Sequence, residues 1–194
     1  MEKLIGKNKI KCAIFISGRG SNLNSLIKYS KSKKSSILVS FVITNNKYAK
    51  GLRYSKSNKI NCATINYKNK YKAESKILKI LKKNNIKLIC LAGFMKVLSN
   101  NFIKSFGYKI VNIHPSLLPK YKGLDAHKRV IENKEKYSGC TVHFVTSKLD
   151  SGKIIMQKKL KITKIDTENS LKFKVLKKEH QLYPKAIKKL LFNL

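Results

Sequence analysis

Short apolar, β-rich runs alternate with helix-like stretches from residue 9 to residue 113, and this alternation constrains the fold more than any other feature of the sequence. The β-rich runs cover residues 9–16, 37–43, 62–66, 87–91 and 109–113. Between two of them, Ile77, Ile80 and Leu81 share one helical face and lysines occupy the other. Strands that alternate with helices predict a mostly parallel sheet covered on both faces, which is a three-layer α/β fold.

The pattern changes near residue 139. Residues 139–146 and 153–162 are two further β-rich runs joined by a short polar segment, which predicts an antiparallel pair. From about Asn169, apolar residues recur at helical spacing, so we expect a final helix with Thr167 or Asn169 as its N-cap. Pro184 lacks a backbone N–H and is expected to kink or interrupt this helix.

Length and composition predict one domain that spans residues 1–194. No linker, internal repeat or shift in composition divides the chain, and 42% of its residues are hydrophobic, which is enough for a core. No run approaches the ~20 apolar residues of a membrane span, and the N-terminal residues lack the apolar core of a signal peptide. We therefore expect a cytoplasmic protein.

The four cysteines point to the same compartment. They lie in or beside β-rich runs and form no C-x-x-C motif: Cys12, Cys62, Cys90 and Cys140. We expect small buried hydrophobic residues in a reducing environment, and neither disulfides nor zinc ligands.

The charge of the chain suggests nucleic-acid binding, but its distribution argues against it. The 44 Lys and Arg residues exceed the 9 Asp and Glu residues by 35. Only three of them are the arginines that base and phosphate recognition prefers, and the lysines are scattered without a basic cluster. Abundant Lys, Asn and Ile together are typical of A+T-rich coding sequence. We expect no specific nucleic-acid partner, and a lysine-rich nucleic-acid-binding protein stays a remote alternative.

A glycine-rich segment after the first β-rich run has the pattern of a phosphate site. Residues 17–22 read Ser-Gly-Arg-Gly-Ser-Asn and precede a helix-like stretch. Glycines let backbone amides approach an anion, and a helix N-terminus adds unpaired N–H groups and a positive dipole end. Leu23 stands where the dinucleotide fingerprint has its third glycine. The alternative is an ordinary turn with Ser21 or Asn22 as helix N-cap.

A second polar pair lies at the end of the fifth β-rich run. Asn112 and His114 are two residues apart, so on a strand their side chains point the same way. Ligands of open parallel sheets bind beyond the C-terminal strand ends, and an amide with an imidazole there could stabilise an oxyanion and move a proton. The alternative is a hydrogen-bonded histidine that ends a strand.

Asp150 is one of few acidic residues and lies in the loop before Gly152. It could raise the pKa of His114 or position a water, or it could serve only as a turn residue. His127, His143 and His180 show no metal-ligand spacing with one another or with cysteine, so no metal site is expected.

Taken together, these segments resemble the phosphoribosylglycinamide formyltransferases, which are folate-dependent enzymes of purine synthesis. The segments that carry the resemblance follow the family's order and cover nearly the whole chain. They are Ser-Gly-Arg-Gly-Ser-Asn (17–22), Leu-Ala-Gly-Phe-Met-Lys-Val-Leu (91–98), Asn-Ile-His-Pro-Ser-Leu-Leu-Pro (112–119), Lys-Gly-Leu-Asp-Ala-His (122–127), Gly-Cys-Thr-Val-His-Phe-Val (139–145), Leu-Asp-Ser-Gly (149–152) and Glu-His-Gln-Leu-Tyr-Pro (179–184).

The resemblance implies a single α/β domain with a Rossmann-like formyltransferase fold, whose seven-stranded sheet is mostly parallel with an antiparallel part near the C-terminus. It implies transfer of a formyl group from the cosubstrate 10-formyltetrahydrofolate to the amine of glycinamide ribonucleotide, with no metal. The expected partners are these small molecules and no membrane, and the expected state is a monomer or a homodimer.

The resemblance also implies roles for individual residues. The catalytic set would be Asn112, His114 and Asp150, with a protonated His114 stabilising the formyl oxygen. The substrate, its 5′-phosphate above all, would be held by Gly18, Arg19, Gly20, Ser21, Asn22 and Glu179. The folate would be held by Leu91, Met95, Lys96, Val97, Leu98, Lys70 and Asn112, together with the loop from Thr146 to Asp150.

The sequence departs from the family pattern near residue 70. Relatives often place an arginine there to meet the folate glutamate, whereas this chain has Lys68, Lys70 and Lys72. A lysine ammonium is a point charge and lacks the two-pronged hydrogen bonding of a guanidinium. Two related enzymes stay as alternatives, methionyl-tRNA formyltransferase and formyltetrahydrofolate deformylase. Each normally carries a further domain for which 194 residues leave no room.

Overall fold

The computed structural model describes residues 9–192. The N-terminal residues 1–8, which lack the apolar core of a signal peptide, lie outside this range. The strands are β1 (Ile10–Ile16), β2 (Ile37–Thr44), β3 (Asn61–Thr64), β4 (Leu88–Leu91), β5 (Lys109–His114), β6 (Tyr137–Phe144) and β7 (Ile154–Lys161). The helices are α1 (Ser21–Lys31), α2 (Leu52–Ser57), α3 (Lys70–Lys83), α4 (Asn100–Phe106), α5 (Ala126–Glu132) and α6 (Glu168–Phe192).

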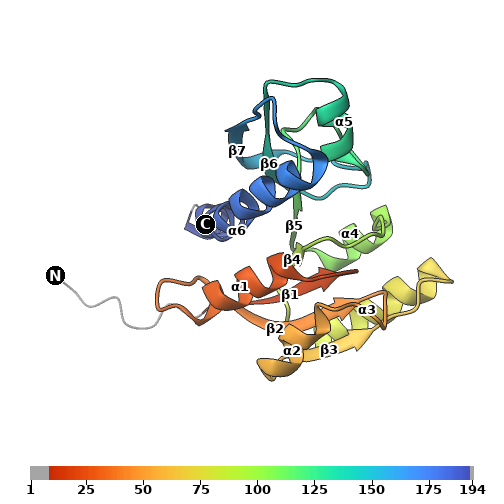
Figure 1. The fold of residues 1–194 in the computed structure, drawn as a ribbon. Helices are drawn as coiled ribbons and strands as arrows, with labels where there is room; N and C mark the ends of the chain where they lie inside the picture. Colours follow the sequence, from red (N-terminus) through yellow and green to blue (C-terminus); the bar gives the residue numbers. More distant parts are fainter. Residues whose placement is uncertain (1–8, 193–194) are drawn as a thin grey trace.

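The strands form one seven-stranded sheet in the order β3-β2-β1-β4-β5-β6-β7 (Figure 1). The first five strands pair in parallel, whereas β6 is antiparallel to β5 and β7 is antiparallel to β6. The prediction of a mostly parallel sheet with an antiparallel C-terminal part is therefore confirmed.

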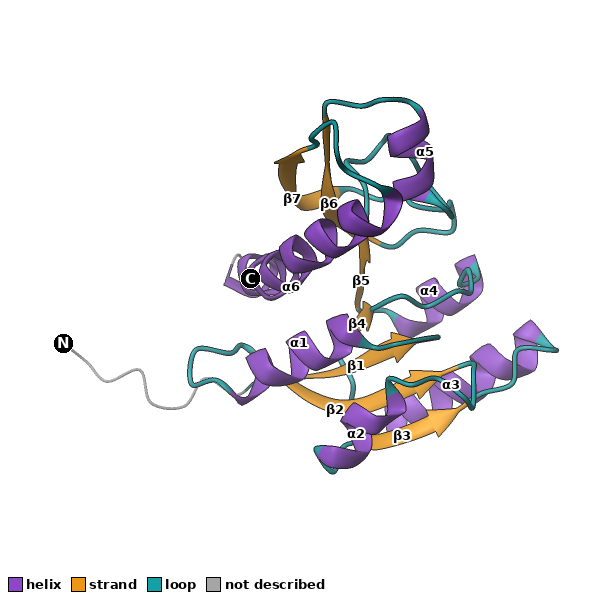
Figure 2. Cartoon of the chain, in the orientation of Figure 1, coloured by secondary structure: helices purple, strands orange, loops and turns teal. Residues whose placement is uncertain are grey.

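Helices cover both faces of the sheet, because each central strand buries side chains on both sides. Along β1, Ile14 packs in a cluster with α1 and α6, while Phe15 packs on the other face with α3 and α4. Both side chains are fully buried. Figure 2 shows the resulting layers, with the long α6 and α1 on one side of the strands and α3 and α4 on the other.

The order of the strands places a crevice at the C-terminal ends of β1, β4 and β5. The chain runs from β1 outward to β3 on one side and then returns to add β4 on the other side of β1. Loops that follow β1 and β4 therefore diverge, and ligands of α/β proteins bind at such a switch point. The glycine-rich segment 17–22, the segment 91–98 and the end of β5 all lie at this edge.

The final helix corrects one expectation and confirms another. Helix α6 runs through Pro184 without interruption. Pro184 cannot donate to the carbonyl of His180 four residues earlier, and the Ser25 hydroxyl of α1 donates to that carbonyl instead at 3.0 Å. Buried residues on both sides of the proline keep the helix docked. Thr167 caps the helix as expected, since its Oγ1 accepts from the Ser170 amide at 3.2 Å.

The cysteines correct a second expectation. Cys12, Cys90 and Cys140 are buried, but Cys62 is exposed because β3 is an edge strand whose side chains are mostly solvent-accessible. All four thiols are free. Within residues 9–192, no helix is long and apolar enough to cross a membrane.

Candidate functional site

A cavity of about 940 Å³ opens at the C-terminal ends of β1, β4 and β5. Its walls are the glycine-rich segment 17–22, the segment 91–98, the end of β5 and the loop that ends at Asp150. Almost every residue predicted for the site lines it. The exception is Lys70, which is the exposed first residue of α3 and does not line the cavity. The volume is in the range of sites that bury small organic ligands.

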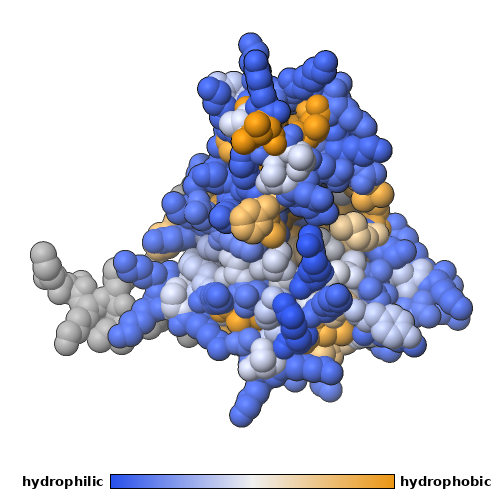
Figure 3. Space-filling view, in the orientation of Figure 1, coloured by the Kyte–Doolittle hydropathy of each residue, from blue (hydrophilic) through white to orange (hydrophobic). Residues whose placement is uncertain are grey.

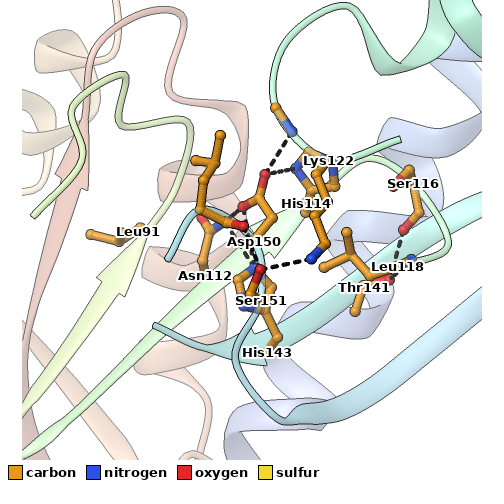
Figure 4. Close-up of polar contacts among 12 residues, drawn as sticks. Leu91, Asn112, His114, Ser116, Leu118, Lys122, Thr141, His143, Asp150 and Ser151 are labelled. Atoms are coloured by element: carbon orange, nitrogen blue, oxygen red, sulfur yellow. Dashed lines mark hydrogen bonds and ion pairs between the residues drawn. The ribbon is translucent and has the colours of Figure 1, made fainter. Parts of the chain in front are cut away.

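Asp150 is the centre of a polar cluster on one wall of this cavity (Figure 4). Its Oδ2 accepts from the Gly123 amide at 2.9 Å and lies 3.3 Å from His114 Nδ1. Its Oδ1 accepts from the Asn112 side-chain amide at 3.4 Å. The backbone of Asp150 has φ 45°, a left-handed conformation that Asp adopts more readily than most residues. The loop thus brings the carboxylate to both predicted partners.

The hydrogen bonds of His114 leave one ring nitrogen for chemistry. Its Nε2 donates to the Tyr121 carbonyl at 2.8 Å, so Nδ1 is the atom that faces Asp150. Burial lowers the pKa of His114 below its ordinary value, although the Tyr121 carbonyl and Asp150 act in the opposite direction. The protonated His114 expected from the sequence therefore stays a prediction, in which burial opposes the effect of the carboxylate.

Asp150 itself stays ionised. Burial raises its pKa, but His143, whose Nε2 lies 3.6 Å from Asp150 Oδ1, the hydrogen bond from the Gly123 amide and the charge of His114 together hold the pKa below its usual value. The site thus pairs a carboxylate with an imidazole whose proton affinity depends on it. Such a pair takes up and releases a proton as one unit.

His143 belongs to this cluster, and the sequence analysis missed it. Antiparallel pairing of β5 and β6 sets His143 directly opposite Asn112. Its Nδ1 donates to the Phe144 carbonyl at 2.8 Å, so its Nε2 accepts from the Asn112 amide at 3.2 Å. Residues 139–146 are predicted as a strand, and residues opposite each other on neighbouring strands share a face. Pairing that strand with the end of β5 would have pointed to His143.

The glycine-rich segment forms an anion-ready helix N-terminus. Gly20 is the N-cap of α1 with φ 72°, and no side chain caps the helix. The alternative of Ser21 or Asn22 as N-cap is therefore wrong, since the helix begins at Ser21. A Cβ on Gly20 would lie 2.6 Å from Gly51 Cα, so the close approach of two backbones requires glycine here. The uncapped first-turn N–H groups and the helix dipole suit a phosphate.

Glu179 of α6 lies beside this segment. The Asn22 side-chain amide donates to Glu179 Oε2 at 2.8 Å, which ties α6 to the start of α1. Glu179 is 6% exposed. Burial raises its pKa to about 7, and the hydrogen bond from Asn22 offsets only part of that effect. Three other residues of α6 line the cavity at helical spacing and were not predicted: Glu168, Lys172 and Leu176.

Glu179→Gln should remove a pH dependence of stability. In the wild type, the folded carboxyl binds its proton up to about pH 7, whereas an ordinary glutamate releases it near 4.5. The free energy of unfolding should therefore fall relative to Glu179→Gln as pH rises from about 4.5 to 7, by about 1.4 kcal/mol per pKa unit, and stay level above. Urea denaturation of both proteins between pH 5 and 8 measures the difference. Parallel curves for the two proteins would contradict the assignment.

The segment after β4 provides an apolar wall. Leu91 and Leu98 are buried, but Met95 and Val97 are 61% and 48% exposed at the cavity, which is apolar surface that a ligand could cover. Ser17 holds this segment against the glycine-rich one, since its amide donates to the Gly93 carbonyl at 3.0 Å and its Oγ accepts from the Met95 amide at 2.8 Å. The two predicted binding regions are thus one connected wall.

Comparisons with known proteins place the chain in a family. The model of the formyl transferase family matches residues 10–187. The chain is 40% identical over 94% of its length to the trifunctional purine biosynthetic protein adenosine-3 of Gallus gallus, and it spans 18% of that protein. It is 38% identical to the phosphoribosylglycinamide formyltransferase of Haemophilus influenzae, and the match covers 92% of this chain and 85% of that enzyme.

A solved structure agrees with these sequence matches. The phosphoribosylglycinamide formyltransferase of Anaplasma phagocytophilum superposes with a TM-score of 0.87 at 39% identity, covering 93% of this chain and 86% of that one. Because the family model matches most of the chain, and relatives of similar length share more than a third of its residues, this chain belongs to the formyl transferase family.

Proposed function

We propose that this protein transfers a formyl group from 10-formyltetrahydrofolate to the amine of glycinamide ribonucleotide in purine biosynthesis. The observation that carries the proposal is that one cavity joins an uncapped helix N-terminus, an exposed apolar wall and the Asn112–His114–Asp150 cluster. The printed names of the relatives, phosphoribosylglycinamide formyltransferases among them, support it. A phosphorylated amine needs the helix N-terminus for its phosphate, and an apolar formyl donor needs the apolar wall. Both must meet at the polar cluster.

The glycine-rich segment fits the phosphate end of the substrate. Backbone amides of residues 18–22 and the exposed Arg19 side chain would hold the anion at the start of α1. Glu179, fixed by Asn22, would accept from the ribose hydroxyls or the glycinamide end. The amine would then point along the cavity toward β5, where Asn112 and His114 end the strand.

The adjoining apolar segment fits the folate. Leu91, Met95, Val97 and Leu98 would contact its ring, and Lys96 lines the same wall. Asn112 lies between this wall and the Asp150 cluster, so it would contact both ligands. Lys70 lies outside the cavity lining and would meet only a part of the folate that extends beyond it. The residues present therefore suit a donor that is apolar at one end.

In the transfer, the substrate amine would gain the formyl group and lose a proton, and the folate nitrogen would release the formyl group and gain a proton. Negative charge then develops on the formyl oxygen, where the Asn112 amide can donate a hydrogen bond. His114 Nδ1, the ring atom free of the Tyr121 carbonyl, carries the proton that it shares with Asp150 Oδ2. Asp150 holds the ring oriented and keeps that proton available.

The same proposal covers the setting of the enzyme. We infer a single-domain formyltransferase unit that works in the cytoplasm as a monomer or a homodimer, on small molecules, without a metal and without a specific nucleic-acid partner. Four free thiols suit a reducing compartment. Hydrophilic side chains cover most of the face drawn in Figure 3, with hydrophobic ones scattered among them.

A direct assay tests the function. Purified protein is incubated with 10-formyltetrahydrofolate and either glycinamide ribonucleotide, methionyl-tRNA or no acceptor, and release of tetrahydrofolate is followed. We expect turnover only with glycinamide ribonucleotide. Turnover with the charged tRNA would indicate a methionyl-tRNA formyltransferase, and release without any acceptor would indicate a deformylase. Either result, or no turnover at all, would overturn the proposal.

A further inference from the structure

Tyr183 is the largest fully buried side chain among the described residues, and it joins three elements of the site. It lies on α6 one helical turn after Glu179. Its hydroxyl donates to the Leu91 carbonyl at 2.9 Å and lies 3.1 Å from the Val111 carbonyl. A single hydroxyl thus connects α6 to the ends of both β4 and β5.

The two carbonyls lie in the last two pairs of the β4–β5 register, next to the cavity. In the parallel register of β4 and β5, Cys90 lies opposite Val111, and Leu91 lies opposite Asn112. Val111 directly precedes Asn112, and Leu91 begins the apolar segment 91–98. Figure 4 shows Leu91 on the strand beside the one that carries Asn112. The hydroxyl therefore holds together the two strands that carry the Asn112 side-chain amide and the start of the apolar wall.

The contacts of Asn112 leave little room for a shift of that point. Its amide reaches His143 at 3.2 Å and Asp150 at 3.4 Å, both at the long end of hydrogen-bond distances. A displacement of a few tenths of an ångström at the end of β5 would break one of them. Groups that stabilise a transition state need positions held to about 0.5 Å.

Tyr183 takes no direct part in proton transfer. It does not line the cavity, and its hydroxyl donates to backbone carbonyls within the core, beside the Cys90 thiol. Burial raises the pKa of Tyr183 well above its ordinary value, so the hydroxyl keeps its proton and remains a donor. Its effect on the site must therefore act through the strands it holds.

We infer that Tyr183 is a positioning residue for formyl transfer, and that its hydroxyl sets the spacing between the ends of β4 and β5 and thereby places the Asn112 amide against the apolar wall. The reaction named here rests on the proposed function, whereas the positioning itself is a property of the fold. The expected consequence of losing the hydroxyl is a misplaced Asn112 in a protein that keeps its core.

The test compares Tyr183→Phe with Tyr29→Phe. The control removes a half-buried hydroxyl of α1 that lies 3.4 Å from Ser36 Oγ, away from the cavity lining. We expect Tyr183→Phe to lower kcat about 10- to 100-fold, as small misplacements do, while KM for glycinamide ribonucleotide changes less than about twofold because the phosphate segment is untouched. Tyr29→Phe should leave both values unchanged. 4-Aminophenylalanine at position 183 keeps a donor and should restore most of kcat.

A second readout is independent of activity. The ¹⁵N resonances of the His143 ring report its Nε2 contact with Asn112, and we expect them to shift in Tyr183→Phe and not in Tyr29→Phe. Unchanged His143 resonances would overturn the proposal, as would an unchanged kcat or a loss of kcat that merely follows the folded fraction. If the wild type transfers no formyl group, the proposed function fails, and the resonances alone decide the role of Tyr183.

Discussion

His114→Ala is expected to lower kcat by about two to four orders of magnitude, the usual contribution of a positioned acid or base, with the fold retained. The reason is geometric. The ring is held at Nε2 by the Tyr121 carbonyl and at Nδ1 by Asp150, and alanine provides neither contact. KM should change little, because the phosphate segment and the apolar wall lie on other elements. Steady-state kinetics on both substrates measures the split.

His180→Ala is the matched control. This histidine is half-buried on α6, outside the cavity lining, and only its backbone carbonyl makes the contact with Ser25. Its removal should leave kcat near the wild-type value. Asn112→Ala should resemble His114→Ala, and the double variant should lose little more than either single one, because the two groups act on one oxygen. Near-normal turnover in both single variants would overturn the catalytic assignment.

The parts of the fold that periodicity encodes were predictable. Strands buried on both faces read as continuous apolar runs, and α3 and α6 show helical spacing, so most elements and the antiparallel end follow from local patterns. The order of the strands is not local. It makes β3 an edge strand and exposes Cys62, which sequence alone assigned to the core. Helix α6 likewise accommodates Pro184 because Ser25, on another helix, donates to the carbonyl that the proline leaves without a partner.

The candidate site divides in the same way. Asn112 and His114 share a face by strand alternation, so their pairing needed no tertiary information. The sequence also indicated Asp150 as a candidate. Its approach to Asn112 and His114 depends on a left-handed turn and on the Gly123 amide, which are features of the folded chain. His143 depends on the register of β6, which sequence does not fix. The net effect of burial on the pKa of His114 depends on packing that no local pattern reports.

Asp150→Asn is expected to lower kcat by about two to three orders of magnitude and to shift its pH profile. Asparagine tolerates the positive φ of 45° and can still accept from the Gly123 amide, so the fold should survive. What disappears is the charge. Burial already lowers the pKa of His114 and the carboxylate is one of the groups that raise it, so the pKa should fall further in the variant.

The direction of the shift separates a catalytic carboxylate from a turn residue. If His114 delivers a proton, activity falls as pH rises through the pKa of the pair, and a lower pKa moves that fall to lower pH. Glu132→Gln is the matched control, because it also removes one carboxylate charge, at an exposed residue of α5 that lies outside the cavity lining. Its profile should coincide with the wild type. An unchanged profile in Asp150→Asn, measured as kcat between pH 5 and 9, would reduce Asp150 to a loop residue.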